Sequence, residues 1–415
     1  MAAGACYNPP SMLLVHLSLT NFRNFIRLEM EFPAGPTLVV GPNAQGKTSL
    51  LEAIDYLVEA DSARAANDRE LLNFLALNDP GGFARILAEV RRADRPQRLE
   101  VRLVLEAGRA ESEPRLQKEI LINGVRRRSS DLAGAWNDVL FQPDDLQVVE
   151  GPPSERRRFL DRTIGQADAA YARVLSEYGR VLTQRNALLR QGRERPGDAR
   201  QLDPWDAQLI ELGVQLTRSR SAAVAEIERM ATPIHAALSR GQEQLRLTYQ
   251  PSGLGGPRRG QLALPLEAPT DWAAIPAATV AEEMRQALDR SRPEEWERGL
   301  TLVGPHRDDL RFLANGVDLR PYGSRGQNRT TMISAKLAQG EWLHRRTGEW
   351  PVLLLDETLA ELDESRRSEV LARVGQYPQA ILTAADLRLF PASFQHSANV
   401  LQLQAGTLRP LSAPA

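Results

Sequence analysis

The sequence predicts an α/β fold in which a lobe with a mixed sheet and a phosphate-binding loop is interrupted by a mostly helical second lobe. Three observations predict it. Apolar and polar residues alternate in several segments near both ends of the chain, which is typical of strands. The segment GPNAQGKT lies between an apolar run and a helical pattern. Through the middle of the chain, apolar residues recur every three or four positions, which indicates paired helices.

The first part of the α/β lobe is expected to begin with two strands. The segment MLLVHLSLTNFRNFIRLEMEF, which starts at Met12, alternates on either side of a turn at Thr20 to Asn24. A third apolar run, TLVVG, ends at Gly41, and SLLEAIDYLVEA after the loop carries apolar residues at helical spacing. The runs RILAEVRR, LEVRLVLEA and EILINGV predict further strands up to about residue 140.

The helical lobe is expected to contain a short antiparallel hairpin. Helical periodicity starts at Ser154, is interrupted by the polar stretch RQGRERPGDARQ, and resumes before Ile227. Each arm has at most about 40 residues, or roughly 60 Å, which is too short for a long coiled coil. We expect Gly165 to break the first arm, and the Pro- and Gly-rich residues 251–275 to form an exposed loop or insertion.

Strand patterns return after Pro293 in LTLVG and PVLLLDE, the second being a continuous apolar run suited to a parallel strand buried on both faces. Four segments are therefore expected. Residues 1–11 form an unstructured leader, 12–150 the N-terminal part of the α/β lobe, 151–299 the helical lobe, and 300–415 the C-terminal part of the α/β lobe.

Composition excludes several classes of protein. No apolar run approaches the roughly 18 residues of a membrane span, and the first residues lack the apolar core of a signal peptide, so we expect a cytoplasmic protein. The single cysteine, Cys6, excludes an internal disulfide and a cysteine metal cluster. The formal net charge of -1 argues against coating nucleic acid through overall charge, so any DNA site must be a local patch.

The strongest motif is a G-x-x-x-x-G-K-[ST] loop in its required setting between strand and helix. Its glycines let backbone N–H groups surround a β-phosphate, Lys47 reaches the β- and γ-phosphates, and the Thr48 hydroxyl binds Mg²⁺. The chain has only three lysines against its many arginines, which makes a lysine here informative. The candidate nucleotide-binding residues are Gly41, Pro42, Asn43, Ala44, Gln45, Gly46, Lys47, Thr48 and Ser49.

A second element decides the class of phosphate-binding loop. PVLLLDETLAELD ends its apolar run in Asp356 and Glu357, where an aspartate can bind Mg²⁺ and a following glutamate can polarise the attacking water. The alternative is a buried strand that ends in two solvated acids. With the loop upstream we favour function, and we take Lys47, Asp356 and Glu357 as catalytic candidates, with Thr48 and Asp356 as the metal ligands.

A third motif lies between these two, in the segment YGSRGQNRT. It resembles the signature of ABC-type ATPases, usually S-G-G-Q, with Arg325 in place of the first glycine. A serine hydroxyl and glycine amides at a helix N-terminus can bind an anion, which in ABC proteins is the γ-phosphate held by the opposite subunit. A D-loop then follows the Asp-Glu strand. These two motifs add Ser324, Gly326, Gln327 and Asp363 to the candidate ATP-binding residues.

Together the motifs resemble the RecF family of bacterial recombination mediators, which are SMC-like ABC-type ATPases. The resemblance runs from about Met12 to Asp386. Residues 1–11 precede the start that is usual in this family, so Met1 and Met12 stay alternative start codons, and the resemblance implies that residues 251–275 are an insertion. Relatives often carry two aspartates where this chain has Asp356 and Glu357. The segments that carry the resemblance are MLLVHLSLTNFRNF, GPNAQGKTSLLEAI, PDDL followed by GPPSERRRFLD, TLVGPHRDDL and YGSRGQNRT.

The resemblance implies a weak ATP hydrolase that uses ATP as a dimerisation switch. Such a homodimer would bind gapped, junction or single-stranded DNA and help RecO and RecR partners load the RecA recombinase, with no membrane partner. The residues themselves support DNA contact only through arginine clusters, Arg126–Arg128 and Arg156–Arg158, which could meet phosphates. The alternative for each cluster is a solvated face or ion pairs with acidic neighbours.

Four further residues have a structural interpretation beside a functional one. Gln142 could be a Q-loop residue or a turn residue, and Thr383 could contact a γ-phosphate or simply end a strand. Arg64 could belong to a nucleotide lid. His306 has no cysteine or histidine at ligand spacing, so a hydrogen-bonded structural histidine is favoured over a metal ligand.

Three rival functions stay open at this point. The main one is an ABC transporter ATPase subunit, against which stand the helical insertion, the non-histidine residue Thr383 and the N-F-R-N-F opening. A P-loop kinase would need neither the signature serine nor self-association. A protein that uses ATP only as a static ligand would bind it without turnover.

Overall fold

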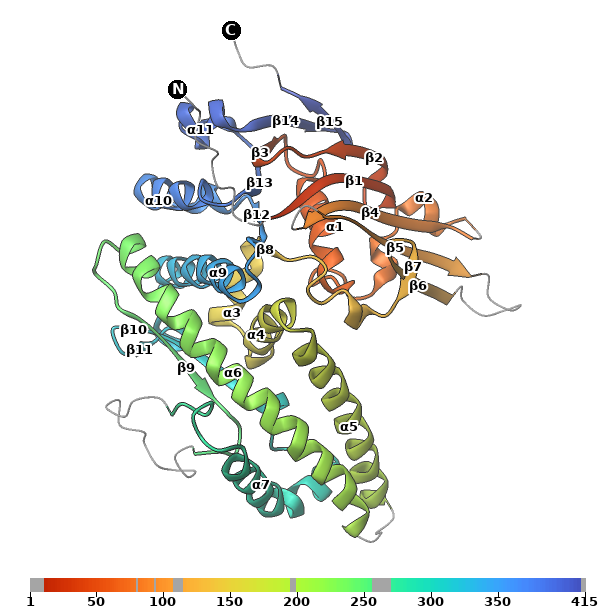
Figure 1. Ribbon diagram of the computed structural model, residues 1–415, viewed down its shortest axis with the longest axis vertical. Helices are drawn as coiled ribbons and strands as arrows, with labels where there is room; N and C mark the ends of the chain where they lie inside the picture. The colour runs from red at the N-terminus through yellow and green to blue at the C-terminus, as the bar shows by residue number, and fades with distance from the viewer. Residues whose placement is uncertain are drawn as a thin grey trace. The chain divides into compact units, whose positions relative to one another are not determined.

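The protein consists of two compact units, described here from a computed structural model that covers residues 11–79, 81–92, 95–106, 115–194, 199–255 and 270–411 (Figure 1). The first unit comprises residues 1–143 and 339–415, and the second comprises residues 144–338. The predicted boundary near residue 300 therefore lies elsewhere, because residues 300–338 group with the helical unit. Residues 1–10 of the expected leader and most of the expected insertion lie outside the described residues.

The first unit contains a six-stranded antiparallel sheet of order β2-β1-β4-β5-β6-β7. One face carries buried apolar residues such as Leu17, Ile86 and Val101, which form a core with helix α1 (Lys47–Glu59). Helix α2 (Phe74–Leu77) follows α1. The strands are β1 (Met12–Phe22), β2 (Phe25–Glu31), β4 (Phe83–Arg92), β5 (Arg95–Glu106), β6 (Arg115–Ile122) and β7 (Val125–Arg127).

A second six-stranded sheet in this unit has the order β15-β14-β3-β13-β12-β8 and is parallel except for β15. All residues of β12 are buried, as its continuous apolar run predicts. Helices α10 (Glu364–Val374) and α11 (Ala392–Ser397) belong to the same unit. The strands are β3 (Gly35–Val40), β8 (Asp138–Phe141), β12 (Val352–Asp356), β13 (Gln379–Ala384), β14 (Asn399–Gln404) and β15 (Thr407–Pro410).

The second unit contains the predicted hairpin, formed by α5 (Ala169–Glu194) and α6 (Asp203–Leu238). The expected break at Gly165 is wrong, because Gly165 lies inside α4 (Pro153–Ala167). The chain turns at Asp168 instead, whose carboxylate accepts the backbone N–H groups of Ala170 and Tyr171 at 2.8 and 3.2 Å and so starts the next helix. The other helices are α3 (Leu146–Glu150), α7 (Ala277–Arg298), α8 (Leu319–Tyr322) and α9 (Arg325–Thr347), which continues into the first unit.

The second unit also contains a three-stranded sheet that the sequence did not predict. Its order is β11-β10-β9, formed by Val317–Asp318, Asp309–Ala314 and Leu245–Gln250. Conversely, the predicted strand LTLVG is irregular. Side chains take up the backbone donors that a sheet would use, because Asn186 Oδ1 accepts from Thr301 N and Glu295 Oε1 accepts from Leu302 N, both at 2.8 Å.

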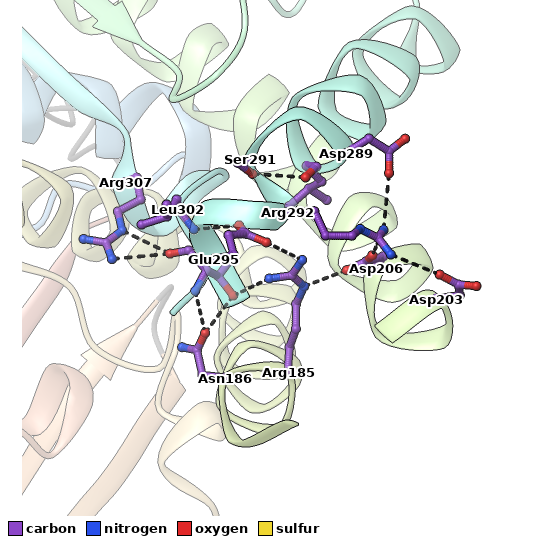
Figure 2. Close-up of polar contacts among 12 residues, drawn as sticks. Arg185, Asn186, Asp203, Asp206, Asp289, Ser291, Arg292, Glu295, Leu302 and Arg307 are labelled. Carbon is purple, nitrogen blue, oxygen red and sulfur yellow. Dashed lines mark hydrogen bonds and ion pairs between the residues drawn. The ribbon is translucent and has the colours of Figure 1, made fainter. Parts of the chain in front are cut away.

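Buried ion pairs connect the helices of this unit (Figure 2). Arg185 of α5 is 0% exposed and donates to Asp206 of α6 at 2.6 Å and to Glu295 of α7 at 2.7 Å. Arg220 of α6 binds Asp161 and Asp308 in the same way. Each guanidinium is satisfied by more than one carboxylate, which is the condition for burying a charge in a core.

His306 is a hydrogen-bonded structural residue. Its Nδ1 lies 2.8 Å from the Tyr178 hydroxyl and its Nε2 lies 3.0 Å from the Thr301 carbonyl oxygen. Because a carbonyl only accepts, Nε2 carries the proton and Nδ1 accepts from Tyr178. No group of metal-ligating side chains is found among the described residues. In the same ranges, no helix combines the length and apolar content needed to cross a membrane.

The protonation of His306 should make stability depend on pH. Burial lowers its pKa to about 4, whereas the unfolded chain titrates near 6.5. Between these values only the unfolded state binds the proton, so stability falls as pH drops from about 6.5 to about 4, by up to about 3 kcal/mol. Urea unfolding of His306→Gln should show a weaker pH dependence in this window than the parent protein. The exposed His396→Gln is the control, and equal slopes for His306→Gln and the parent would contradict the assignment.

Candidate nucleotide-binding site

The phosphate-binding loop lies between β3, which ends at Val40, and α1, which begins at Lys47. Gly46 has a φ of 104°, and a Cβ at this position would lie 2.2 Å from the Asn24 amide nitrogen. At Gly41 a Cβ would lie 2.3 Å from the carbonyl oxygen of Leu403. Both glycines are therefore required by the local geometry. The loop ends at the N-terminus of α1, where backbone N–H groups favour an anion.

Two segments distant in sequence hold this loop. Asn24, in the turn between β1 and β2, donates its side-chain amide to the Gln45 carbonyl oxygen at 2.9 Å. The Gln45 side chain accepts the backbone N–H of Ala405 at 2.7 Å. Sequence reasoning did not single out Asn24. The turn at Thr20 to Asn24 was predicted from the strand pattern, but the contact of Asn24 with the loop depends on tertiary structure.

The ammonium group of Lys47 is held by three contacts. Its side chain is 3% exposed, and Nζ donates to the carbonyl oxygens of Gly41 at 2.6 Å and Pro42 at 2.8 Å. Nζ also lies 3.0 Å from Oε1 of Glu357. The loop lysine and the glutamate after β12 therefore form an ion pair, which brings together two residues that lie far apart in the sequence.

The acidic pair lies at the carboxyl edge of the parallel sheet. In the register of β12 and β13, Asp356 faces Thr383, whose hydroxyl donates to Asp356 Oδ1 at 2.8 Å. The same hydroxyl oxygen accepts the backbone N–H of Glu357 at 3.1 Å. Glu357 has a φ of 50°, a left-handed conformation that is unfavourable for this residue type. Thr383 thus connects both acids.

Asp356 is buried and close to the loop. Burial raises the pKa of its carboxyl group above the ordinary value, while hydrogen bonds from Thr48 and Thr383 and the charge of Arg64 act in the opposite direction. The Thr48 hydroxyl and the Asp356 carboxylate are therefore neighbours, and Arg64 lies within electrostatic reach. Gln142 directly follows β8, whose Phe141 pairs with Leu355, so it lies at the same edge.

The signature segment belongs to the second unit and begins helix α9. Ser324 Oγ accepts the backbone N–H of Gln327 at 3.2 Å, and the Gln327 side chain accepts the backbone N–H of Ser324 at 2.9 Å. This reciprocal pair is a capping box, which gives both residues a structural role. Gln327 also donates to Glu243 at 2.9 Å. Ser324 is exposed, and a Cβ added to Gly326 would meet no described atom within 4 Å.

Asp363 also has a capping role. Its carboxylate accepts the backbone N–H of Arg366 at 2.9 Å at the start of α10, and it lies 3.1 Å from the Arg366 guanidinium. The side chain is 52% exposed, so a second ligand can still approach it. The cap explains why an aspartate stands here without any nucleotide.

The structure changes the interpretation of the arginine clusters. Arg156 is only 2% exposed and forms a bidentate pair with Asp309, at 2.6 and 3.1 Å. Arg157 donates to the Asp308 carbonyl oxygen at 2.7 Å. The prediction that Arg156 could contact a phosphate is therefore wrong, because its guanidinium group is already paired with Asp309 inside the second unit. Arg126 is exposed but pairs with Glu119 of the neighbouring strand.

Comparisons with known proteins match nearly the whole chain. The family model described as RecF/RecN/SMC N terminal domain matches residues 13–407. A protein of Chloroflexus aurantiacus named DNA replication and repair protein RecF is 42% identical over 393 residues, covering 92% of this chain and 96% of the relative. Its namesake from Bacillus subtilis is 36% identical over 399 residues, covering 96% of this chain and 100% of the relative.

Solved structures extend the similarity to three dimensions. A structure described as the recombination mediator protein RecF bound to ATP, in the RecFOR pathway, aligns with a TM-score of 0.82 at 27% identity, covering 98% of this chain and 100% of that one. An Smc head domain from Pyrococcus furiosus aligns with a TM-score of 0.53 at 18% identity and shares the fold alone. The predicted fold class is thereby confirmed. Given the family model and relatives that match nearly its whole length, the chain belongs to the RecF family.

Proposed function

We propose that this protein is a DNA-repair ATPase that binds DNA as an ATP-dependent dimer and helps load a recombinase on single-stranded DNA. The observation that carries the proposal is a chain of three contacts along the sheet edge. Lys47 pairs with Glu357, the backbone of Glu357 donates to Thr383, and Thr383 donates to Asp356. The names of the relatives support a role in replication and repair, and the similar RecF–ATP structure supports ATP as the ligand. Neither names a transporter, so the ABC transporter alternative is not favoured.

Binding follows from the loop geometry. The backbone N–H groups of residues 43–49 surround the phosphates, and Lys47 exchanges its present partners for phosphate oxygens. Thr48 and Asp356 offer a hydroxyl and a carboxylate oxygen, the ligand types that Mg²⁺ prefers, and a metal ion there neutralises phosphate charge. Because the loop is fixed by Asn24 and Gln45, little reorganisation is needed.

Hydrolysis is assigned to Glu357. Its carboxylate is 35% exposed, and it is the acid in this site that can both approach a water and move away from Lys47. Asp356 is buried at 4% exposure and is held by the Thr383 hydroxyl, which suits a fixed metal ligand better than a base. Glu357 then accepts the proton of the attacking water, while Lys47 stabilises charge on the γ-phosphate.

Dimerisation is assigned to the signature segment and the D-loop. Ser324 is exposed at the N-terminus of a helix of 23 residues, and Gly326 leaves its surroundings open among the described residues. An anion presented by a second copy therefore has access to this terminus. We further propose that the dimer binds gapped, junction or single-stranded DNA and acts with RecR and RecO type mediators, as the RecFOR title of the similar structure suggests.

Replacing Lys47 tests the nucleotide site. Lys47→Arg keeps the charge, but a planar guanidinium does not fit where an ammonium now lies 2.6 and 2.8 Å from two carbonyl oxygens. ATP affinity, measured by calorimetric titration, should fall at least about ten-fold, which is roughly 1.4 kcal/mol. The control is Lys118→Arg, since Lys118 binds the Ala60 carbonyl oxygen and Asp68 instead. Unchanged ATP affinity and turnover in Lys47→Arg would refute the site.

Replacing Ser324 tests the dimer. Ser324→Arg adds bulk and charge at an exposed helix terminus, so ATP binding to the monomer should stay nearly intact while the ATP-induced dimer is lost. Light scattering after size-exclusion chromatography distinguishes the monomer from the dimer. The exposed Ser393→Arg makes the same chemical change elsewhere and should still dimerise. A Ser324→Arg protein that forms the dimer with ATP would show that the signature does not act across subunits.

Replacing Glu357 tests the assigned base. In Glu357→Gln the amide can still orient a water but cannot accept its proton, so single-turnover hydrolysis should slow by about 10²–10⁴-fold while Mg²⁺-ATP stays bound. The dimer on DNA should then dissociate more slowly, as followed by dilution of a labelled complex. Glu369→Gln on α10, paired with Arg373, is the control. If the dimer lifetime matches that of the parent protein, hydrolysis does not control release.

A further inference from the structure

A buried carboxylate lies beneath three arginines on the outer face of the antiparallel sheet of the first unit. Along β5, Leu99 and Val101 point into the core and are at most 1% exposed, so Glu100 between them points to the opposite, solvent-facing side. Glu100 is nevertheless only 3% exposed. The side chains that cover it are Arg85 of β4 and Arg98 and Arg102 of β5, and we name these four residues the Glu100 cluster.

The cluster gathers three guanidinium groups around one carboxylate. Arg85 and Arg102 face each other directly in the ladder of β4 and β5, a placement in which like charges repel. Glu100 Oε1 accepts the Nε–H of Arg85 at 2.8 Å and of Arg102 at 2.7 Å. Arg98 adds a third guanidinium at 3.5 Å. One carboxylate therefore holds three guanidinium groups together, while Glu89 faces Arg98 and Glu119 faces Arg102 in the neighbouring strands.

Glu100 stays ionised at neutral pH. Burial alone would raise the pKa of this carboxyl group, but the hydrogen bonds from Arg102 and Arg85 bring it below its ordinary value. The anchor of the two arginines is therefore permanent under physiological conditions, and their side chains are held in place before any ligand arrives.

The anchored arginines direct their remaining donors away from the sheet. Arg85 and Arg102 each bind Glu100 through Nε, and within the described part of the chain their terminal guanidinium nitrogens have no other hydrogen-bond partner. The two side chains are 29% and 41% exposed. Planar forks with two adjacent N–H groups match the oxygens of a phosphate, and prior anchoring reduces the entropy lost on binding.

The strand register extends this charge into a row. Thr20 of β1 is paired with Arg27 of β2 on one side and with Arg85 of β4 on the other. Arg27, Arg85 and Arg102 therefore lie along one line across four adjacent strands, a span of about 14 Å at the usual strand spacing. Arg27 is 78% exposed. Glu119 faces Arg102 directly in the ladder of β5 and β6, and Glu29 lies 3.8 Å from Arg27 on the same strand, so an acidic residue limits the row at each end.

We propose that the Glu100 cluster is a binding site for phosphodiester groups of the DNA backbone. In a chain whose net charge is -1, attraction to DNA needs such a local concentration of arginine. A flat sheet face with guanidinium forks contacts phosphates and does not enter a groove, so the contact is independent of base sequence. The inference rests on the proposed function only in that DNA is the ligand, and it adds the surface that binds it.

The test measures DNA affinity as a function of salt for variants of the cluster. The triple variant Arg85→Gln, Glu100→Gln, Arg102→Gln removes two guanidinium groups together with the carboxylate that they bind. No buried carboxylate is therefore left without a partner. With a labelled duplex of mixed sequence and ATP present, its affinity should fall at least about ten-fold at 0.1 M salt, and the slope of log affinity against log salt should decrease by about 2. ATP affinity should be unchanged, which shows that the variant is folded.

The matched control makes the same charge change elsewhere. Arg285→Gln, Glu282→Gln, Arg298→Gln alters exposed residues of α7 that form ion pairs along the helix, and it should keep the parent affinity and slope. If the triple variant of the cluster is unstable, Arg102→Gln alone leaves Glu100 with Arg85 and Arg98, and its slope should decrease by about 1.

The outcomes separate the inference from the proposed function. A parent protein that binds no DNA overturns both. A parent that binds DNA, together with cluster variants whose affinity and slope equal those of the α7 control, overturns the inference and leaves the proposed function intact. Unchanged DNA affinity with loss of inorganic phosphate binding would likewise overturn it, because the site would then serve a free anion.

Discussion

The ion pair between Lys47 and Glu357 is the interaction on which the candidate site depends. It joins the phosphate-binding loop to the edge of the parallel sheet at a distance of 3.0 Å, and it places the cation that would contact a γ-phosphate beside the acid that would activate water. The other contacts maintain it: the Gly41 and Pro42 carbonyl oxygens direct Lys47, and Thr383 fixes the left-handed backbone of Glu357. A bound phosphate competes with Glu357 for Lys47, so nucleotide binding would itself release the acid.

The second unit is stabilised in a different way. Its helices are joined by guanidinium groups that are almost fully buried, with Arg185 connecting α5, α6 and α7, and with Arg220 connecting α6 to α4 through Asp161. Such pairs require specific geometry, and they select one packing of the helices over others. The signature segment with Ser324 belongs to this same unit, directly before helix α9.

Features that depend on a short stretch of sequence were predicted, whereas contacts between distant segments were not. The loop, its helix and the buried strand before Asp356 depend on short contiguous patterns and were predicted correctly. The strand at LTLVG was wrong because Asn186, distant in sequence, and Glu295, near the end of the preceding helix α7, take its backbone donors. The contacts of Asn24, Thr383 and Glu100 depend on tertiary register, which no single segment encodes. The roles of the site residues stay predictions.

We propose that ATP acts as a dimerisation switch on DNA, and sedimentation velocity of the unmodified protein is the sharpest test of this switch. The samples contain the protein alone, with ADP, with ATP, and with ATP and a gapped duplex. The account predicts a monomer without nucleotide or with ADP, a dimer with ATP, and a dimer that sediments with the DNA when both are present. An identical sedimentation coefficient with ATP and with ADP, on and off DNA, would contradict it.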